Sequence, residues 1–200
     1  MRAAAIGRVA GLALIVAGVL MLGCAVFNHA RANWAQHTAL EALKEASGTA
    51  VSLGDTTLPP RLEAGAPLGT LEIPRLNLAT VVFEGEDEPT LAKGVGHLWD
   101  TSLPWQGGNT ALAAHRDSFF RPLEHIRIGD AMRLVTPQGN YDYVVRETFV
   151  VDPTDLWVLD PTPQPTLTLI TCYPFNYIGP APRRFIVRAE RIQEPRSPSA

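Results

Sequence analysis

Cysteine is scarce in this sequence, with two in 200 residues, so a scaffold held together by disulfides is excluded. Cys24 lies inside a long apolar run near the N-terminus, where it is not available to pair with the second cysteine. Cys172 therefore stands in the chain as an unpaired thiol. Its surroundings in the sequence decide whether it is a reactive group or a buried structural side chain.

Charge is also sparse, at 18% charged residues and a formal net charge of −3, and the basic side chains are scattered. Nucleic-acid-binding proteins instead gather Lys and Arg into a patch that neutralises phosphates. The sequence lacks Cys-x-x-Cys and His-Glu-x-x-His patterns, and no glycine-rich phosphate loop follows a strand and opens a helix. We therefore expect no nucleic-acid partner, no metal site and no cofactor.

The first feature that is present is an apolar run over residues 9–27, which carries no charge. At about 1.5 Å of rise per residue, a helix of this length nearly crosses the hydrocarbon core of a membrane. Arg2 and Arg8 precede the run and no acidic residue does, which places the N-terminus in the cytoplasm and the rest outside. We expect residues 1–28 to be an uncleaved, single-pass anchor. A cleaved signal peptide and a lipoprotein signal ending at Cys24 are the alternatives.

Residues 29–69 are expected to form a stalk helix that stops near Gly48, followed by a Pro/Gly-rich linker. The helix is predicted by apolar residues at helical spacing, namely Trp34, Leu40 and Leu43. At the other end of the chain, the composition of residues 193–200 is typical of a disordered tail. The folded domain is therefore expected between these two segments, over residues 70–192.

That central region is expected to be mainly β, because short runs rich in Val, Ile, Leu, Thr and Phe alternate with turn residues. About seven such runs are found, at residues 70–76, 79–85, 110–115, 132–137, 141–151, 166–171 and 184–192. No repeat and no regular helical stretch between strands calls for βαβ units. A closed or nearly closed β-barrel with short helices is the architecture that this pattern favours.

The run TLTLITC, residues 166–172, ends in the unpaired cysteine. Strand alternation places Leu167 and Leu169 on one face and Cys172 on the other. Pro174 follows two residues later, and since proline has no N–H to donate, the strand should end with Cys172 near a rim. A lone cysteine is commonly a buried structural thiol. An extracytoplasmic location favours a reactive thiol or an intermolecular bond instead.

A nucleophilic thiol needs a base or cation beside it and a donor that stabilises the oxyanion of an acyl intermediate. His97 and His115 lie in the barrel region, and His115 ends an apolar run as Cys172 ends another. Arg183 and Arg184 directly precede the apolar run that begins at residue 185. Taken alone, each of these histidines and arginines is also compatible with an ordinary surface group.

These residues carry a resemblance to a known family. TLITC, residues 168–172, matches the TLxTC signature of sortases, the membrane-anchored cysteine transpeptidases of bacterial surfaces. Residues 94–130 look like the sortase segment with the catalytic histidine, and residues 172–189 look like the segment from the catalytic cysteine to the arginine-bearing strand. The resemblance covers about residues 71–191. The stretches HRDSFFRPL and CYPFNYIGPAP are most similar to class D sortases.

The resemblance implies a sortase-like closed β-barrel of seven to eight strands and a role for each matched residue. Cys172 would be the nucleophile that attacks the carbonyl between Thr and Gly of an LPxTG-like sorting signal, giving a thioester. His115 would protonate the leaving amine and then deprotonate the incoming one. Arg184, with Arg183 as the second choice, would hold substrate and oxyanion.

Two further residues are assigned by the same resemblance. Thr171 matches the signature threonine and is expected to help place the substrate or the oxyanion. His97 corresponds to an accessory, non-catalytic histidine on the substrate side of the site. No cofactor is implied.

The implied partners are surface proteins bearing a C-terminal LPxTG-like signal and an acceptor amine, such as a peptidoglycan stem peptide or a protein lysine. Two alternatives remain open at this point. A cysteine endopeptidase on the same scaffold would release the acyl group to water. A catalytically silent, membrane-tethered barrel would keep Cys172 merely buried, with slow alkylation.

Overall fold

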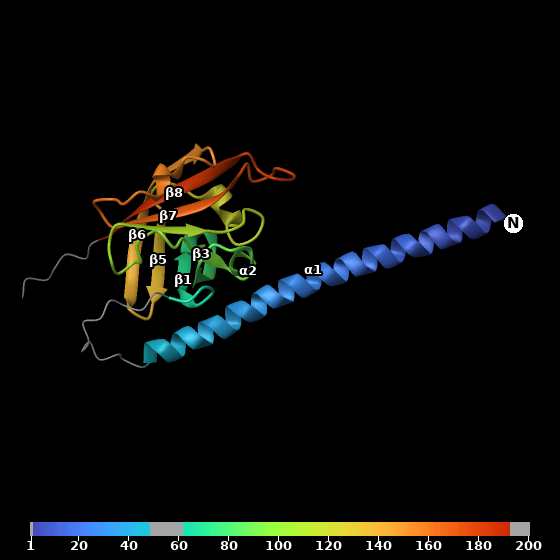
Figure 1. Ribbon diagram of the computed structural model, residues 1–200, viewed down its shortest axis with the longest axis horizontal. Helices are drawn as coiled ribbons and strands as arrows, with labels where there is room; N and C mark the ends of the chain where they lie inside the picture. The colour runs from blue at the N-terminus through green and yellow to red at the C-terminus, as the bar shows by residue number, and fades with distance from the viewer. Residues whose placement is uncertain (1, 49–61, 193–200) are drawn as a thin grey trace, which may run out of the picture.

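The computed structural model describes residues 2–48 and 62–192, which form one long helix and a β-barrel (Figure 1). Helix α1 (Arg2–Gly48) is continuous over 47 residues. The expected anchor and stalk are therefore one element, because no proline or glycine interrupts residues 28–33 between them. Within the described residues, α1 is the one helix that is long and apolar enough to cross a membrane. Of the expected linker, which runs to residue 69, residues 49–61 lie outside the described residues, as does the tail, residues 193–200; β1 begins at Pro67, three residues before the expected start of the domain.

The described residues contain eight strands that close into a barrel, as predicted, in the order β1-β2-β3-β4-β7-β8-β6-β5. Their bounds are β1 Pro67–Ile73, β2 Leu78–Glu84, β3 Val95–His97, β4 Asn109–Ala113, β5 Ala131–Thr136, β6 Gly139–Val151, β7 Thr166–Tyr173 and β8 Arg183–Arg191. Strand β3 was absent from the expected runs. The short helices are α2 (Glu88–Leu91) and the 3-10 turns η1 (Pro74–Leu76), η2 (Arg121–His125) and η3 (Leu156–Leu159).

Two of the strand pairs are parallel, β2 with β3 and β4 with β7, and the other pairs are antiparallel. The β4–β7 pair joins segments that are far apart in sequence, since β5 and β6 lie between them along the chain. Parallel neighbours end at the same edge of a sheet. The carboxyl ends of β4 and β7 therefore meet at one end of the barrel.

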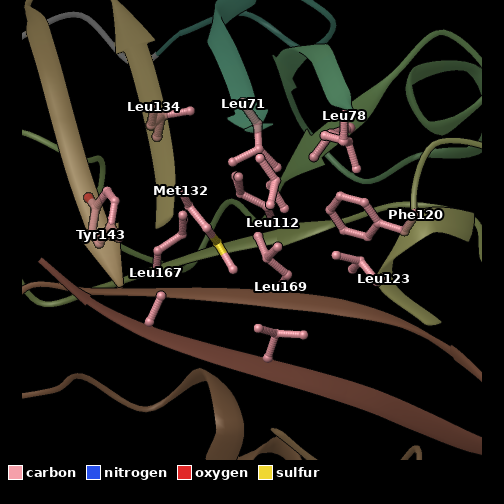
Figure 2. Packing of buried hydrophobic residues seen from close by; sticks show 14 of the residues in the cluster. Leu71, Leu78, Leu112, Phe120, Leu123, Met132, Leu134, Tyr143, Leu167 and Leu169 are labelled. Carbon is pink, nitrogen blue, oxygen red and sulfur yellow. The ribbon is translucent and has the colours of Figure 1, made fainter. Parts of the chain in front are cut away.

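The barrel interior is filled by large apolar side chains, shown in Figure 2. Leu112 of β4 and Leu167 and Leu169 of β7 are fully buried there, each contributing about 1.5–3 kcal/mol relative to an exposed position. Burial also raises the pKa of Tyr143 to about 12, so its hydroxyl stays neutral. This packed interior fixes which face of β7 points outward.

The last turns of α1 pack on the barrel wall beside β2. Ala39 and Leu43 form a small apolar cluster with Val81 and Phe83. The amide of Gln36 joins two backbone segments, because its Oε1 accepts from Val81 N at 2.7 Å and its Nε2 donates to the carbonyl of Lys93 at 2.6 Å. The helix is thus bound to the barrel by polar and apolar contacts. Trp34, expected on the same apolar face, is instead 71% exposed.

Candidate active site

Cys172 lies near the end of β7, one residue before the strand stops at Tyr173. The alternation along β7 is as expected: Leu167 and Leu169 enter the barrel core, whereas Ile170 packs in a separate cluster and Cys172 is half-buried. The Cys172 thiol is free. The strand therefore presents an unpaired, partly accessible thiol at a rim of the barrel.

His115 is brought to the same rim by the parallel pairing of β4 and β7. Ala113 is in register with Ile170, and the pairing continues where Ala114 N donates to the carbonyl of Ile170 at 3.3 Å. Strand β4 ends at Ala113, so His115 follows two residues beyond the last paired position, at the same edge of the sheet as the end of β7. The imidazole of His115 is 38% exposed, and its Nε2 lies 3.6 Å from a carboxylate oxygen of Glu88.

Arg184 lies across from Cys172 on the other neighbouring strand. The antiparallel register of β7 and β8 pairs Cys172 directly with Arg184, and partners of this kind present their side chains on the same face of the sheet. Its guanidinium Nη1 donates to the carbonyls of Ala181, at 3.4 Å, and Arg183, at 3.1 Å. Arg184 is half-buried and lies at the same rim of the barrel as the Cys172 thiol.

Arg183 occupies a different position. It pairs with Tyr173 in the register, so it lies on the opposite face of β8 from Arg184. Its Nε is 3.7 Å from a carboxylate oxygen of Asp152, and both side chains are well exposed. The register therefore separates the two arginines that the sequence left as first and second choice.

Thr171, which was expected to help place the substrate or the oxyanion, is buried at 2% exposure. Its hydroxyl donates to the carbonyl of Ala114 at 2.7 Å, which ties β7 to the residue just before His115. A side chain engaged inside the wall has no surface left for direct contact with substrate. The bond links the end of β7 to the residue that follows β4.

His97 is buried as well, at 1% exposure, and lies inside the barrel wall. Its Nδ1 is 3.0 Å from a carboxylate oxygen of Glu84, and its Nε2 is 3.2 Å from the hydroxyl of Thr101. That hydroxyl accepts from the backbone N–H of Ala111 in β4 at 3.1 Å. His97 thus supports the strand that leads to His115 and does not face the rim.

Two arginines that sequence reasoning did not single out fix the β7–β8 loop, residues 174–182. Arg116 donates through Nη2 to the carbonyls of Tyr177, at 2.7 Å, and Gly179, at 3.0 Å. Arg121 donates through Nη1 to the carbonyl of Phe175 at 2.9 Å. The segment after His115 therefore holds the segment after Cys172. The stretch HRDSFFR showed the residue types, but their carbonyl partners depend on the fold.

Asn109 is a buried structural residue that sequence reasoning did not single out. At 1% exposure, it accepts the hydroxyl of Thr168 at 2.7 Å and donates to the carbonyls of Val158, at 2.9 Å, and Asp160, at 3.1 Å. These bonds fasten the connection between β6 and β7 onto the start of β4. No single local pattern around Asn109 marks this role.

The family profile described as Sortase domain matches residues 71–192. The chain belongs to the sortase family. Sortase D of Bacillus subtilis is 34% identical over 195 residues, which are 92% of this chain and 98% of the relative. Sortase A of Listeria monocytogenes is 32% identical over 54% of this chain and 50% of the relative.

Solved structures agree with this assignment. A Clostridium perfringens Sortase D5 transpeptidase matches this sortase with a TM-score of 0.70 and 27% identity, over 80% of this chain and 99% of that one. Clostridium perfringens sortase C, solved with the C-terminal cell wall sorting motif, matches with a TM-score of 0.62 and 27% identity, over 78% and 88% of the two chains. The family is one of cysteine transpeptidases, and class D members are among the relatives, as the sequence predicted.

Proposed function

We propose that this sortase is a membrane-anchored cysteine transpeptidase that attaches surface proteins bearing an LPxTG-like sorting signal to an amine. The proposal rests chiefly on the strand register, which sets Cys172 between His115 beyond β4 and Arg184 on β8. The similar Clostridium perfringens sortase C, solved with a C-terminal cell wall sorting motif, supports the substrate class.

The first half-reaction is acylation of Cys172. Its thiolate attacks the carbonyl carbon of the Thr–Gly peptide bond, and the carbonyl electrons move onto oxygen to give a tetrahedral oxyanion. The oxyanion collapses, the carbon–nitrogen bond breaks, and His115 gives its proton to the departing amine. The products are a thioester on Cys172 and a free C-terminal fragment that begins with glycine.

The second half-reaction returns the enzyme to its starting state. His115, now neutral, takes a proton from the acceptor amine as that amine attacks the thioester carbonyl. The carbon–sulfur bond breaks, the thiolate leaves, and a new amide joins the surface protein to the acceptor. The acceptor is a primary amine of a peptidoglycan stem peptide or a protein lysine.

Arg184 supplies the positive charge and N–H donors for the oxyanion, because it is the cross-strand partner of Cys172. Its present acceptors are two carbonyls at 3.1 and 3.4 Å, so substrate oxygens compete only with weak neutral hydrogen bonds. Thr171 and His97 are positioning residues in this scheme, since both act on β4 from within the wall.

The anchor and the site are consistent with an extracytoplasmic enzyme. Residues 14–27 of α1 are exposed in the protein, as expected for a segment surrounded by lipid. With the N-terminus in the cytoplasm, the barrel lies outside the cell membrane. The partial exposure of Cys172 favours this enzyme over a silent barrel with a buried thiol.

Intact-mass analysis of residues 30–200, incubated with LPxTG-type peptides, tests the proposal. The segment retains the turns of α1 that pack on the barrel. With an amine such as triglycine present, we expect a transient thioester adduct and an amide-linked product, both absent in Cys172→Ala. In His115→Ala we expect the rate of adduct formation to fall by about 10²–10⁴-fold.

Two results would contradict the proposal in different ways. Discharge of the adduct to free acid, regardless of the amine, identifies a peptidase. Absence of any adduct across a set of sorting-signal peptides, together with alkylation of Cys172 as slow as that of a buried thiol, identifies a silent barrel.

A further inference from the structure

The β7–β8 loop carries an apolar tip in open solvent. Ile178 is 97% exposed, the largest exposed fraction of any large hydrophobic side chain among the described residues, and the adjacent Tyr177 is 46% exposed. Covering a fully exposed isoleucine with an apolar environment lowers the free energy. The tip lies six residues after Cys172, so whatever covers it also lies near the candidate active site.

The exposure of Ile178 is imposed by a fixed backbone. Arg116 binds the carbonyls on both sides of it, those of Tyr177 at 2.7 Å and Gly179 at 3.0 Å. Phe175 anchors the start of the loop in the barrel core, at 8% exposure. The loop is therefore built to present Ile178 outward, and its side chain cannot easily fold back onto the barrel.

The charge of the loop suits an anionic surface. Residues 173–184 contain no acidic residue and end in two arginines, of which Arg183 is exposed and lies 3.7 Å from a carboxylate oxygen of Asp152, whereas Arg184 is half-buried at the candidate site. Basic groups beside an apolar tip are typical of segments that bind at the lipid–water boundary, where anionic headgroups attract them.

The geometry of α1 places such a surface within reach. The apolar run ends at Phe27, and nine residues later Gln36 is already bound to the barrel, a rise of about 14 Å along the helix. Trp34 lies in this interval and is 71% exposed, as suits a residue at a membrane interface. Figure 1 shows the connection between β7 and β8 projecting from the barrel on the side toward which the N-terminal half of α1 runs.

We propose that the β7–β8 loop docks on the surface of the membrane that holds α1, with Ile178 and Tyr177 entering the boundary between headgroups and acyl chains. This inference rests on the proposed anchoring by α1. Docking holds the Cys172 rim at the lipid surface. Substrates tethered in the same membrane then meet the thiol at a raised effective concentration.

Site-directed spin labelling of the full chain in phosphatidylcholine/phosphatidylglycerol nanodiscs tests the proposal. A background with Cys24→Ser and Cys172→Ala removes the native thiols, and Ile178→Cys carries the nitroxide. The matched control is Ile128→Cys, because Ile128 is also an exposed isoleucine of the barrel, at 69%. A third label at Leu20→Cys reports on the anchor itself. Power saturation compares collisions with oxygen, which enriches in lipid, and with a water-soluble nickel chelate.

We expect the label at 178 to collide with oxygen in several-fold excess over nickel, relative to the label at 128. The excess should disappear when the full chain is kept in solution by an amphipathic polymer without a lipid bilayer. If the label at 178 behaves like that at 128 while the label at 20 is in lipid, docking is wrong and anchoring stands. If the label at 20 is also in water, both are wrong. The catalytic proposal is untouched by either result, because no substrate or thiol chemistry enters the measurement.

Discussion

The two ends of the β4–β7 pair use polar side chains in opposite ways. Toward the start of the strands, Asn109 and Thr168 are 1% and 0% exposed, and the Asn109 amide makes three hydrogen bonds within the protein. Toward the end, His115 and Cys172 are half-buried, and the His115 ring lies 3.6 Å from a carboxylate oxygen of Glu88.

This difference separates structure from chemistry along a single pair of strands. Buried polar groups with all partners present fix one arrangement and are costly to disturb. Half-exposed groups with spare donors and acceptors are free to bind substrate. Substitutions at the two ends should therefore have opposite effects on stability and catalysis. The predictions for Cys172, for the two arginines of β8 and for Asn109 test this difference.

The largest effect is expected for Cys172→Ala, at the end of the β4–β7 pair where the side chains are half-exposed (the open end). We expect acyl transfer to an amine to fall by at least about 10⁴-fold, because the nucleophile is removed. The free energy of unfolding should change by less than about 1 kcal/mol, since the thiol is only half-buried. Product formation by chromatography and urea unfolding measure the two. A large loss of stability would assign Cys172 to the structural end instead.

The two arginines of β8 give the next largest effect. Arg184→Ala should lower the rate of acylation by about 10²–10³-fold, because the donor for the oxyanion is lost. Arg183→Ala is the matched control and should stay within about threefold, since its exposed charge faces Asp152. Stopped-flow or quenched-flow kinetics measure the rate of acylation in both variants. The reverse order of effects would mean that the register does not select the functional arginine.

Asn109→Leu probes the start of the β4–β7 pair, where the polar side chains are buried (the closed end). Its removal leaves the Thr168 hydroxyl and the carbonyl of Asp160 without partners, and leaves the carbonyl of Val158 only the longer bond from Arg188 at 3.5 Å. We therefore expect a loss of about 2–3 kcal/mol in the free energy of unfolding. Thr168→Val removes only one of these bonds and should cost about 1 kcal/mol. Chemical denaturation of both variants measures this. Equal losses would show that the hydrogen bonds from Asn109 to the β6–β7 connection do not contribute to stability.

A smaller, pH-dependent effect is expected at Asp130, away from the β4–β7 pair. Hydrogen bonding and charge from Arg75, together with the Arg127 N–H at 2.8 Å, lower the pKa of Asp130 against the opposing effect of its burial. The stabilisation is present above the unfolded pKa of about 3.9 and is lost as the pH falls through the lowered folded value.

Asp130→Asn should therefore cost about 1–2 kcal/mol at pH 7, and the difference from wild type should shrink below about pH 4. Acyl transfer at pH 7 should be unchanged, since this pair lies outside the site. Urea unfolding of both proteins from pH 7 to pH 3 provides the measurement. A difference that stays constant over this range would contradict the role of the Arg75 pair.

Sequence reasoning predicted much of the fold because its signals are local. Alternation in TLTLITC placed Leu167 and Cys172 on opposite faces, and Pro174 predicted that the strand ends near Cys172; in the structure the face of Leu167 is the core face. The apolar run predicted a helix that could cross a membrane, but not its unbroken continuation to Gly48. Strand β3 was missed because three residues are too few to show a period.

The arrangement of the site could be predicted only in part. The roles of His115 and Cys172 came from the family resemblance, whereas their alignment depends on the parallel pairing of β4 with β7, which is not encoded in either strand alone. The burial of Thr171 and His97 depends likewise on neighbours distant in sequence. Arg116 binds backbone carbonyls some sixty residues away in the sequence. Every residue has a backbone carbonyl, so the residue types in the sequence do not indicate which carbonyls Arg116 binds.

Thiol bridging at the open end tests the central claim most directly, namely that β4 and β7 bring His115 beside Cys172. In residues 30–200, which retain Cys172 alone, His115→Cys would provide a second thiol, with His125→Cys as the control on an exposed turn. We predict that dibromobimane, which fluoresces when it bridges neighbouring thiols, links positions 115 and 172 in the folded protein and leaves the control unbridged. Equal fluorescence from both variants, or none from the first, would contradict the proposed alignment of the site.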